Sequence, residues 1–222
     1  MHYMVPQRQG KKRVVSVGSA ATACLLCFAF DVFAQGTLTV EYPPPHPEAR
    51  PADFWHENLE PEDHRDPPPL RVPDGTRLLS RGKPVTASVE TPRRGTLAQI
   101  TDGDKGFGPE SVVEIGPGLQ WVQIDLEEAA EIHAVAVWHN YDARRVYFCV
   151  IVQVSNDPEF KEGVRTLYNN DTENEAGLGA GKDKLYVETH KGRLIPAAGA
   201  RARYVRLYTK GNSNSANNHY IE

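Results

Sequence analysis

The sequence has little cysteine and no excess of basic residues. Its 222 residues include three cysteines, Cys24, Cys27 and Cys149, which are too few for a disulfide scaffold or a four-cysteine zinc site. Lysine and arginine number 25 against 29 aspartate and glutamate, a formal charge of −4. Because nucleic-acid-binding proteins carry a basic surface that attracts phosphates, this balance argues against a nucleic-acid partner.

Long hydrophobic runs are also scarce, and residues 14–30 form a short uncharged, mostly apolar stretch near the start. Cationic residues precede it, and Val32 and Ala34 stand where a signal peptidase reads small side chains. The pattern predicts a signal peptide over residues 1–34 and export to an extracellular, periplasmic or cell-surface location, with no stable membrane span after cleavage. The alternatives are a retained membrane anchor and a lipoprotein acylated at Cys24 or Cys27.

Prolines crowd residues 41–75, and glutamate and aspartate fill most of the gaps between them. Proline removes backbone donors and fixes φ, so such a segment builds no ladders and buries little surface. We therefore expect residues 35–77 to be a disordered, acidic, proline-rich linker that acts as a solvated, semi-rigid tether. The alternative is that Phe54 and Trp55 dock on a neighbouring surface.

From about residue 78 onward the pattern is that of short strands separated by turns. Residues 121–126 alternate, with positions 122, 124 and 126 on one face, and residues 203–208 alternate with Val205 and Leu207 inward. Residues 132–139 are rich in β-forming side chains, and residues 146–154 are apolar enough for a central strand. No long amphipathic helix is present in the sequence. The pattern predicts an all-β fold, an antiparallel sandwich or jelly roll.

Several short motifs occur in this part of the chain in a fixed order, and together they are more specific than any one alone. They are AQITDGD at residues 98–104, QWVQIDL at 120–126, VWH at 137–139, VQVSND at 152–157 and ARYVRLY at 202–208.

This set resembles the discoidin domain, also called the coagulation factor 5/8 C-terminal domain, of the galactose-binding-like superfamily that includes family 32 carbohydrate-binding modules. The resemblance covers residues 78–222 and implies an eight-stranded antiparallel jelly roll. It also implies a non-catalytic module that binds glycans, lipids or proteins through loops at one end. Because relatives continue for several residues beyond the position of Glu222, the last strand is expected to be incomplete.

A cation site is the first chemical expectation. Asp102 and Asp104 flank Gly103, and carboxylates and turn carbonyls are the hard oxygen donors that calcium prefers. The resemblance implies that a glutamate near the C-terminus closes this loop around a structural calcium ion. The implied ligands are the side-chain oxygens of Asp102 and Glu222, with Gln99, Asp104, Phe107 and Ile221 giving mainly carbonyl oxygens. On the residues alone, an acidic turn without a metal is the alternative.

The ligand-binding surface is expected in the loops around two strand ends, because loop-borne histidine, arginine, asparagine and tyrosine suit sugar recognition. Some sugar-binding relatives use a histidine and an arginine in comparable loops, which points to His139 and Arg145 first. The alternative is that His139 caps a strand and that Arg145 pairs with Asp142. The complete candidate set is His139, Asn140, Arg144, Arg145, Tyr147 and Asn170.

Other conspicuous side chains are expected to be structural. Trp121 and Trp138 lie within predicted strands, which favours the core over a stacking platform. Cys149 lies in the most apolar strand, which predicts a buried, inert thiol.

No complete catalytic motif occurs in the sequence, so we expect no enzymatic activity. We expect an exported, non-catalytic module, most consistent with carbohydrate binding, whose partner is a glycan or a cell-surface protein. The alternatives are a protein-binding or adhesion module of an envelope complex, and the accessory domain of a larger secreted enzyme cut short after residue 222.

Overall fold

The structure is a computed structural model that describes residues 35–47, 53–63 and 65–222. The signal peptide predicted for residues 1–34, with Cys24 and Cys27, lies outside the described residues, so cleavage and export stay predictions. No helix in the described part of the chain is long and apolar enough to cross a membrane.

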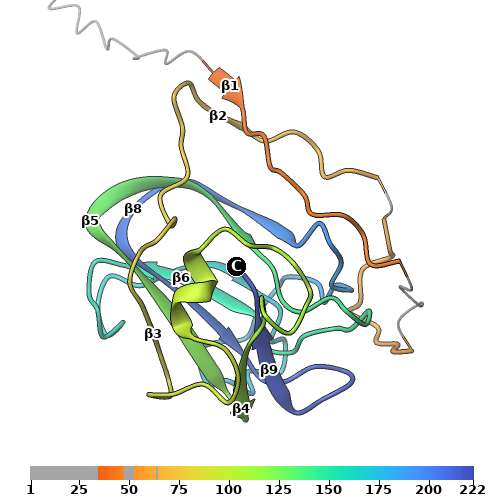
Figure 1. Ribbon diagram of the computed structural model, residues 1–222. Coiled ribbons are helices and arrows are strands. Elements are labelled where there is room, and N and C mark those ends of the chain that lie inside the picture. Colours follow the sequence, from red (N-terminus) through yellow and green to blue (C-terminus); the bar gives the residue numbers. More distant parts are fainter. Residues whose placement is uncertain (1–34, 48–52, 64) are drawn as a thin grey trace, which may run out of the picture. The chain divides into compact units, whose positions relative to one another are not determined.

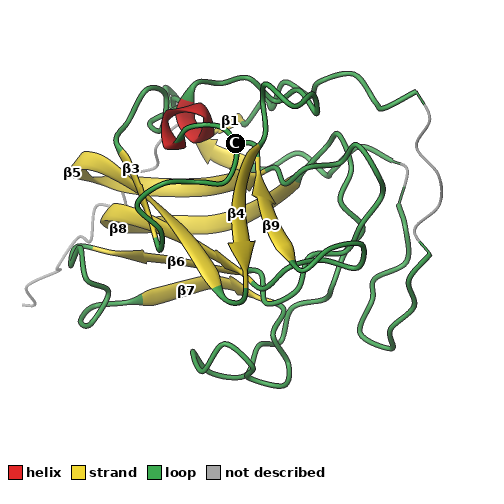
Figure 2. Ribbon diagram, turned by 60° about the horizontal axis from the view of Figure 1, so that its bottom comes forward, coloured by secondary structure: helices red, strands yellow, loops and turns green. Residues whose placement is uncertain are grey.

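The fold is almost entirely β, as the alternating pattern predicted. Nine strands are described: β1 Gln35–Thr37, β2 Arg71–Pro73, β3 Val85–Ala87, β4 Val113–Pro117, β5 Gln120–Val137, β6 Ile151–Ser155, β7 Arg165–Asn169, β8 Arg193–Thr209 and β9 Asn217–Tyr220. One 3-10 helix, η1, covers Leu97–Thr101 (Figure 2).

The strands form an antiparallel sandwich. A five-stranded sheet has the order β3-β5-β8-β6-β7, and β4 pairs with β9 in a second sheet that packs against it (Figures 1 and 2). The packing brings Ile115 and Tyr220 of the small sheet against Val122 and Leu207 of the large one. The two sheets therefore contain seven strands in the described residues, against the eight expected, and β1 and β2 pair separately.

Residue alternation along β5 and β8 decides which side chains face the core. In the ladder Val122 lies opposite Leu207 and Ile124 opposite Val205, so these four share the inner face. The inward faces predicted for residues 121–126 and 203–208 are confirmed.

Two predicted strands, 121–126 and 132–139, are joined in the structure into the single strand β5. Register shifts after Asp125 and Ile132, and a positive φ of 71° at Glu127, bend the strand where the sequence indicated a break. The strand predicted for residues 146–154 is shorter in the structure, because Cys149 has φ 48° and regular pairing begins at Ile151.

The described parts of the proline-rich segment contact the sandwich, which differs from the solvated tether that the sequence predicts. Its β1 pairs with β2, and Leu59 forms a parallel bridge with Leu185. Phe54 packs on Phe148 with ring centroids 5.4 Å apart, as the docking alternative predicted, whereas Trp55 is 83% exposed. Proline kept the segment out of the main sheets but did not prevent it from lying along them.

Candidate functional site

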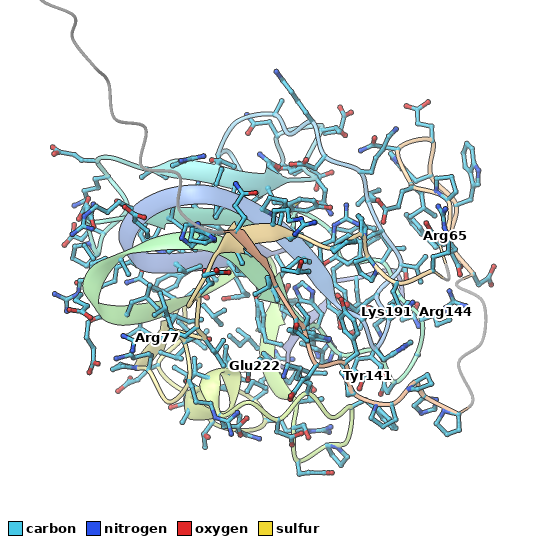
Figure 3. The ribbon with its side chains drawn as sticks, turned by 90° about the horizontal axis from the view of Figure 1, so that it is seen from above. Arg65, Arg77, Tyr141, Arg144, Lys191 and Glu222 are labelled. Carbon is cyan, nitrogen blue, oxygen red and sulfur yellow. The ribbon has the colours of Figure 1, made fainter. Side chains whose placement is uncertain are left out.

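A small polar cavity lies where the loop between β5 and β6 meets the loop before β8. Its volume is about 170 Å³. Both loops contribute to its wall, as does the proline-rich part of the chain (residues 35–77), called the N-terminal segment below. Figure 3 shows Tyr141, Arg144 and Lys191 close to one another at the right of the view. The lining residues are Pro45, His46, Asp63, Tyr141, Arg144, Glu188, Thr189, His190 and Lys191.

A buried polar pair lies behind this cavity. His139 Nδ1 is 2.9 Å from Glu188 Oε2, and both side chains have no exposed surface. The Tyr147 ring stacks on His139 at 4.2 Å, and its hydroxyl donates to the Asn140 carbonyl at 3.1 Å. Within the described residues, His139 Nε2 and Glu188 Oε1 are buried without a hydrogen-bond partner. Glu188 thus keeps an unused acceptor oxygen in the interior, behind the cavity wall.

The adjacent arginines Arg144 and Arg145 have different roles. Arg145 is buried and pairs with the carboxylate of Asp142, which is the alternative that the sequence left open. Arg144 lines the cavity and pairs with Glu62 of the N-terminal segment. Burial lowers the pKa of Arg144, although an arginine remains protonated at neutral pH.

Tyr141 supplies an aromatic wall and a fixed hydroxyl. Its oxygen donates to the Lys105 carbonyl at 2.8 Å, and its ring contacts Phe107 with centroids 5.4 Å apart. Burial, with smaller contributions from Asp104 and Glu188, raises the pKa of Tyr141 to about 12. The phenol is therefore neutral at physiological pH, and the side chain is buried, with 2% of its surface exposed.

A turn that requires glycine positions the cations at the cavity edge. Gly192 has φ 60°, and a Cβ there would lie 2.4 Å from the Val137 carbonyl oxygen and 2.8 Å from the Trp138 ring. The turn places Lys191 and Arg193 on either side of Gly192, directly before and at the start of β8. Another residue at this position would shift both cations.

The structure places five of the six predicted ligand residues in the interior. His139, Asn140, Arg145, Tyr147 and Asn170 are all less than 10% exposed. Asn170 links backbone segments, since its Oδ1 accepts from the Val150 amide at 2.8 Å. These five therefore support the loops from within, and Arg144 is the predicted residue that lines the cavity.

The sequence analysis missed the residues of the loop before β8 that line the cavity: Glu188, Thr189, His190 and Lys191. Their available signal was a run of polar residues directly before a glycine and a β-rich stretch. That signal is common in surface loops and did not distinguish this one.

The predicted structural residues are placed as follows. Trp138 and Cys149 are buried, as expected. Trp121 is only half-buried, on the outer face of β5, where the Arg206 guanidinium lies 4.3 Å from its ring centroid. The prediction of a core position is therefore correct for Trp138 and incomplete for Trp121.

The acidic turn at Gly103 meets the C-terminal residue. Gly103 has φ 82°, and its amide donates to Glu222 Oε2 at 3.0 Å. Burial raises the pKa of Glu222 to about 7, and the nearby carboxylate of Asp102 adds to the increase. Two carboxylates, one of them desolvated, therefore converge on this turn as hard oxygen donors, and the positive charges of Lys105 and Arg81 lie near Glu222 as well.

The other predicted calcium ligands have partners of their own. Asp104 accepts from the Gly106 amide at 2.9 Å and from Ser111 Oγ at 2.7 Å, and the Gln99 side chain bonds to Thr96 and to the Glu110 carbonyl. Phe107 packs on Tyr141, and the Ile221 amide donates to the Trp138 carbonyl at 2.9 Å. Among the described residues, no group of three or more histidine, cysteine, aspartate or glutamate side chains is placed to hold a metal ion. A site here would therefore depend on carbonyl oxygens in addition to Asp102 and Glu222.

A larger cavity, of about 640 Å³, lies between the inner face of β5 and the N-terminal segment. Its walls are mainly apolar, with Ile124, Leu126 and Ile132 on one side and Leu38 and Val40 on the other. Arg77 and Glu222 lie at its edge, away from the small polar cavity (Figure 3). The N-terminal segment thus lies over a part of the inner face of β5.

Comparison with known proteins gives similarities of fold alone. No family model and no curated protein matches the chain. Three similar solved structures are a family 89 glycoside hydrolase from Clostridium perfringens, a fucose-binding module from Streptococcus pneumoniae and the CBM32 of AlyQ in complex with 4,5-unsaturated mannuronic acid.

Their sequence identities are 20%, 14% and 22%, and their TM-scores 0.46, 0.45 and 0.39. The similarity covers 65%, 66% and 63% of this chain, and 14%, 95% and 90% of the other chains. Because the chain spans only 14% of the hydrolase, and because every TM-score is below 0.5, no ligand or activity is transferred from these structures.

Proposed function

We propose that the protein is a non-catalytic carbohydrate-binding module. The observation that carries the proposal is the polar cavity at the loop end of the sandwich. A volume of about 170 Å³ is below the roughly 300–1,000 Å³ of pockets for drug-sized ligands, so the cavity suits one small polar unit of a larger ligand.

The chemistry of the cavity wall supports a sugar unit. Hydroxyl groups both donate and accept, and the wall combines the donors Arg144 and Lys191 with the hydroxyl of Thr189, which can do either. The buried side chains behind the wall fix these groups, which lowers the entropy lost on binding.

Two further parts of the proposal come from the sequence. We propose that the chain is exported, with its signal peptide removed before Gln35. We also propose a structural calcium ion held between the Gly103 turn and Glu222, which would tie the loop after η1 to the end of β9. The convergence of Asp102 and Glu222 supports this assignment.

A glycan array with matched histidine variants tests the binding function. His190→Ala removes a cavity side chain, whereas His133→Ala makes the same change on β5, outside this cavity. We expect His190→Ala to weaken glycan binding by about tenfold, equivalent to 1.4 kcal/mol, and His133→Ala to leave it unchanged. An array without binders would exclude the carbohydrate function and favour a protein partner, and equal losses in both variants would exclude this cavity as the site.

A further inference from the structure

Arg144 and Lys191 line the small cavity, and together with Arg193 they are paired with carboxylates from one stretch of the proline-rich segment, residues 35–77. Arg144 pairs with Glu62, Lys191 Nζ lies 3.0 Å from Asp66 Oδ1, and Arg193 donates to Glu60 Oε1 at 2.6 Å. Arg144 comes from the loop between β5 and β6, Lys191 from the loop before β8, and Arg193 is the first residue of β8. The carboxylates come from seven consecutive positions of the chain.

The Arg193 guanidinium is held in place independently of its carboxylate partner. It lies over the rings of Tyr186 and Tyr168, at 4.9 and 5.4 Å from their centroids. Cation–π contacts of this kind orient a planar guanidinium and leave its edge free for a bidentate acceptor. Gly192 fixes the turn beside it. The orientation of Arg193 therefore comes from the sandwich itself, whereas Lys191 Nζ also donates to the Arg65 carbonyl of the segment at 2.9 Å.

The contact between the segment and the sandwich is short and lies near the surface. The Glu60 amide donates to the Leu185 carbonyl at 2.9 Å, and the Leu185 amide donates to the Asn58 carbonyl at 3.1 Å. The carboxylate side chains of Glu62 and Asp66 keep 31% and 82% of their surface exposed. Ion pairs with exposed partners contribute little net stability and are screened by salt, so another anion can compete for these cations.

We propose that Arg144, Lys191 and Arg193 form a binding site for the carboxylates of an acidic polysaccharide, a polyuronate, and that Glu60, Glu62 and Asp66 occupy this site when the polymer is absent. The inference rests on the proposed carbohydrate-binding function and adds the class of glycan. Because the whole chain carries a formal charge of −4, it has no general attraction for polyanions. A polyuronate would therefore bind through a local cationic group such as this one.

Two triple variants of the full chain test the proposal. Glu60→Gln, Glu62→Gln and Asp66→Asn together remove the occupying charges. The matched control, Glu41→Gln, Asp53→Asn and Glu57→Gln, removes three exposed carboxylates from the same segment. We expect the first variant to bind oligogalacturonate about tenfold more tightly than the wild type by calorimetry at 0.15 M salt, and the control to match the wild type.

Two additional measurements define the site and its occupant. Lys191→Gln with Arg193→Gln should abolish oligogalacturonate binding. In the wild type, oligogalacturonate should accelerate hydrogen exchange at the Glu60 amide, because the polymer displaces the segment from Leu185. This second measurement needs no substitution in the sandwich and is unaffected by a folding defect.

Four results would overturn the proposal: an unchanged affinity in the first variant, an equal gain in both triple variants, an equal gain for dextran sulfate, or unaltered exchange at Glu60 under saturating polymer. If one of these results is obtained but neutral glycans still bind the wild type, the acidic class of ligand is excluded and the proposed carbohydrate-binding function stands. If the wild type and all variants bind no glycan, the proposed function fails as well.

Discussion

Two of the regions where carboxylates pair with nitrogen-bearing side chains differ in burial. In the interior, His139 and Glu188 form a pair with no exposed surface, packed against Tyr147. At the edge of the sandwich, Glu62 and Asp66 reach Arg144 and Lys191 with part of each carboxylate in solvent. The interior pair is therefore excluded from solvent, whereas the pairs at the edge of the sandwich are partly hydrated.

This difference in burial indicates which of the two contacts the folded state requires and which can dissociate without unfolding. A buried pair that loses one member leaves the other uncompensated in a medium of low dielectric constant. When an ion pair near the surface loses one member, the remaining side chain is solvated by water. We therefore regard the His139–Glu188 pair as part of the core, and the contacts of Glu60, Glu62 and Asp66 as an exchangeable layer over it.

The largest effect is expected from breaking the interior pair. Glu188→Ala should lower the free energy of unfolding by about 3–5 kcal/mol, because His139 is then left without its partner inside the core. Urea unfolding at constant pH measures this. Glu62→Ala, at the exposed edge, should cost less than about 1 kcal/mol. Equal costs for the two substitutions would contradict the comparison.

A cation at the Gly103 turn should have the next largest effect, since Glu222 is intermediate in burial between the two regions. Calcium at 100 times its Kd should stabilise the protein by about 2.7 kcal/mol. Thermal melting with calcium and with chelator measures this, and Asp102→Asn should remove the difference whereas Asp74→Asn should not. An equal melting temperature with calcium and with chelator would show that Asp102 and Glu222 form only a turn contact.

Removing all three edge carboxylates should have a smaller effect on stability. Glu60→Gln, Glu62→Gln and Asp66→Asn together should cost roughly 0.2–1 kcal/mol per pair in low salt, and less in 1 M salt because the pairs are screened. Urea unfolding at two salt concentrations gives the comparison. A large loss that persists in high salt would place these carboxylates in the core.

The smallest effect is expected at Cys149, which reports whether the interior opens. Burial, with Asp171 and Glu175 nearby, raises the pKa of its thiol to about 12. The thiolate that attacks alkylating reagents is therefore scarce at pH 8, and the native protein should resist iodoacetamide. The protein unfolded in urea should be labelled readily, and rapid labelling of the native state would contradict a closed interior.

The strands in which apolar and polar residues alternate could be predicted from the sequence. Alternation in residues 121–126 and 203–208 assigns the inner faces of β5 and β8 correctly, because burial on one face of a strand leaves that signal. The joining of 121–126 to 132–139 could not be predicted. It depends on the backbone at Glu127 adopting a positive φ, which no local residue pattern indicates.

The predicted ligand residues stay a prediction, and the structure places five of their six side chains in the interior. His139 and Arg145 carry groups of the kind that bind sugars, but in the structure these groups are paired with Glu188 and Asp142. Glu188 is 49 positions from His139, so the pair exists only after the strands assemble. Docking of the proline-rich segment was equally hidden, because it depends on partners such as Leu185 and Phe148 elsewhere in the chain.

The long ladder between β5 and β8 has a consequence for how the protein folds. It pairs Gln120 with Thr209 and Val137 with Arg193, so the central strands of the sheet are distant in the sequence. Topologies dominated by such distant pairings fold slowly, because the loop between them must close before any contact compensates. The ladder cannot form until synthesis has passed residue 209. Until then the apolar face of β5 lacks its partner, and the nascent chain depends on chaperones or on rapid completion to avoid aggregation.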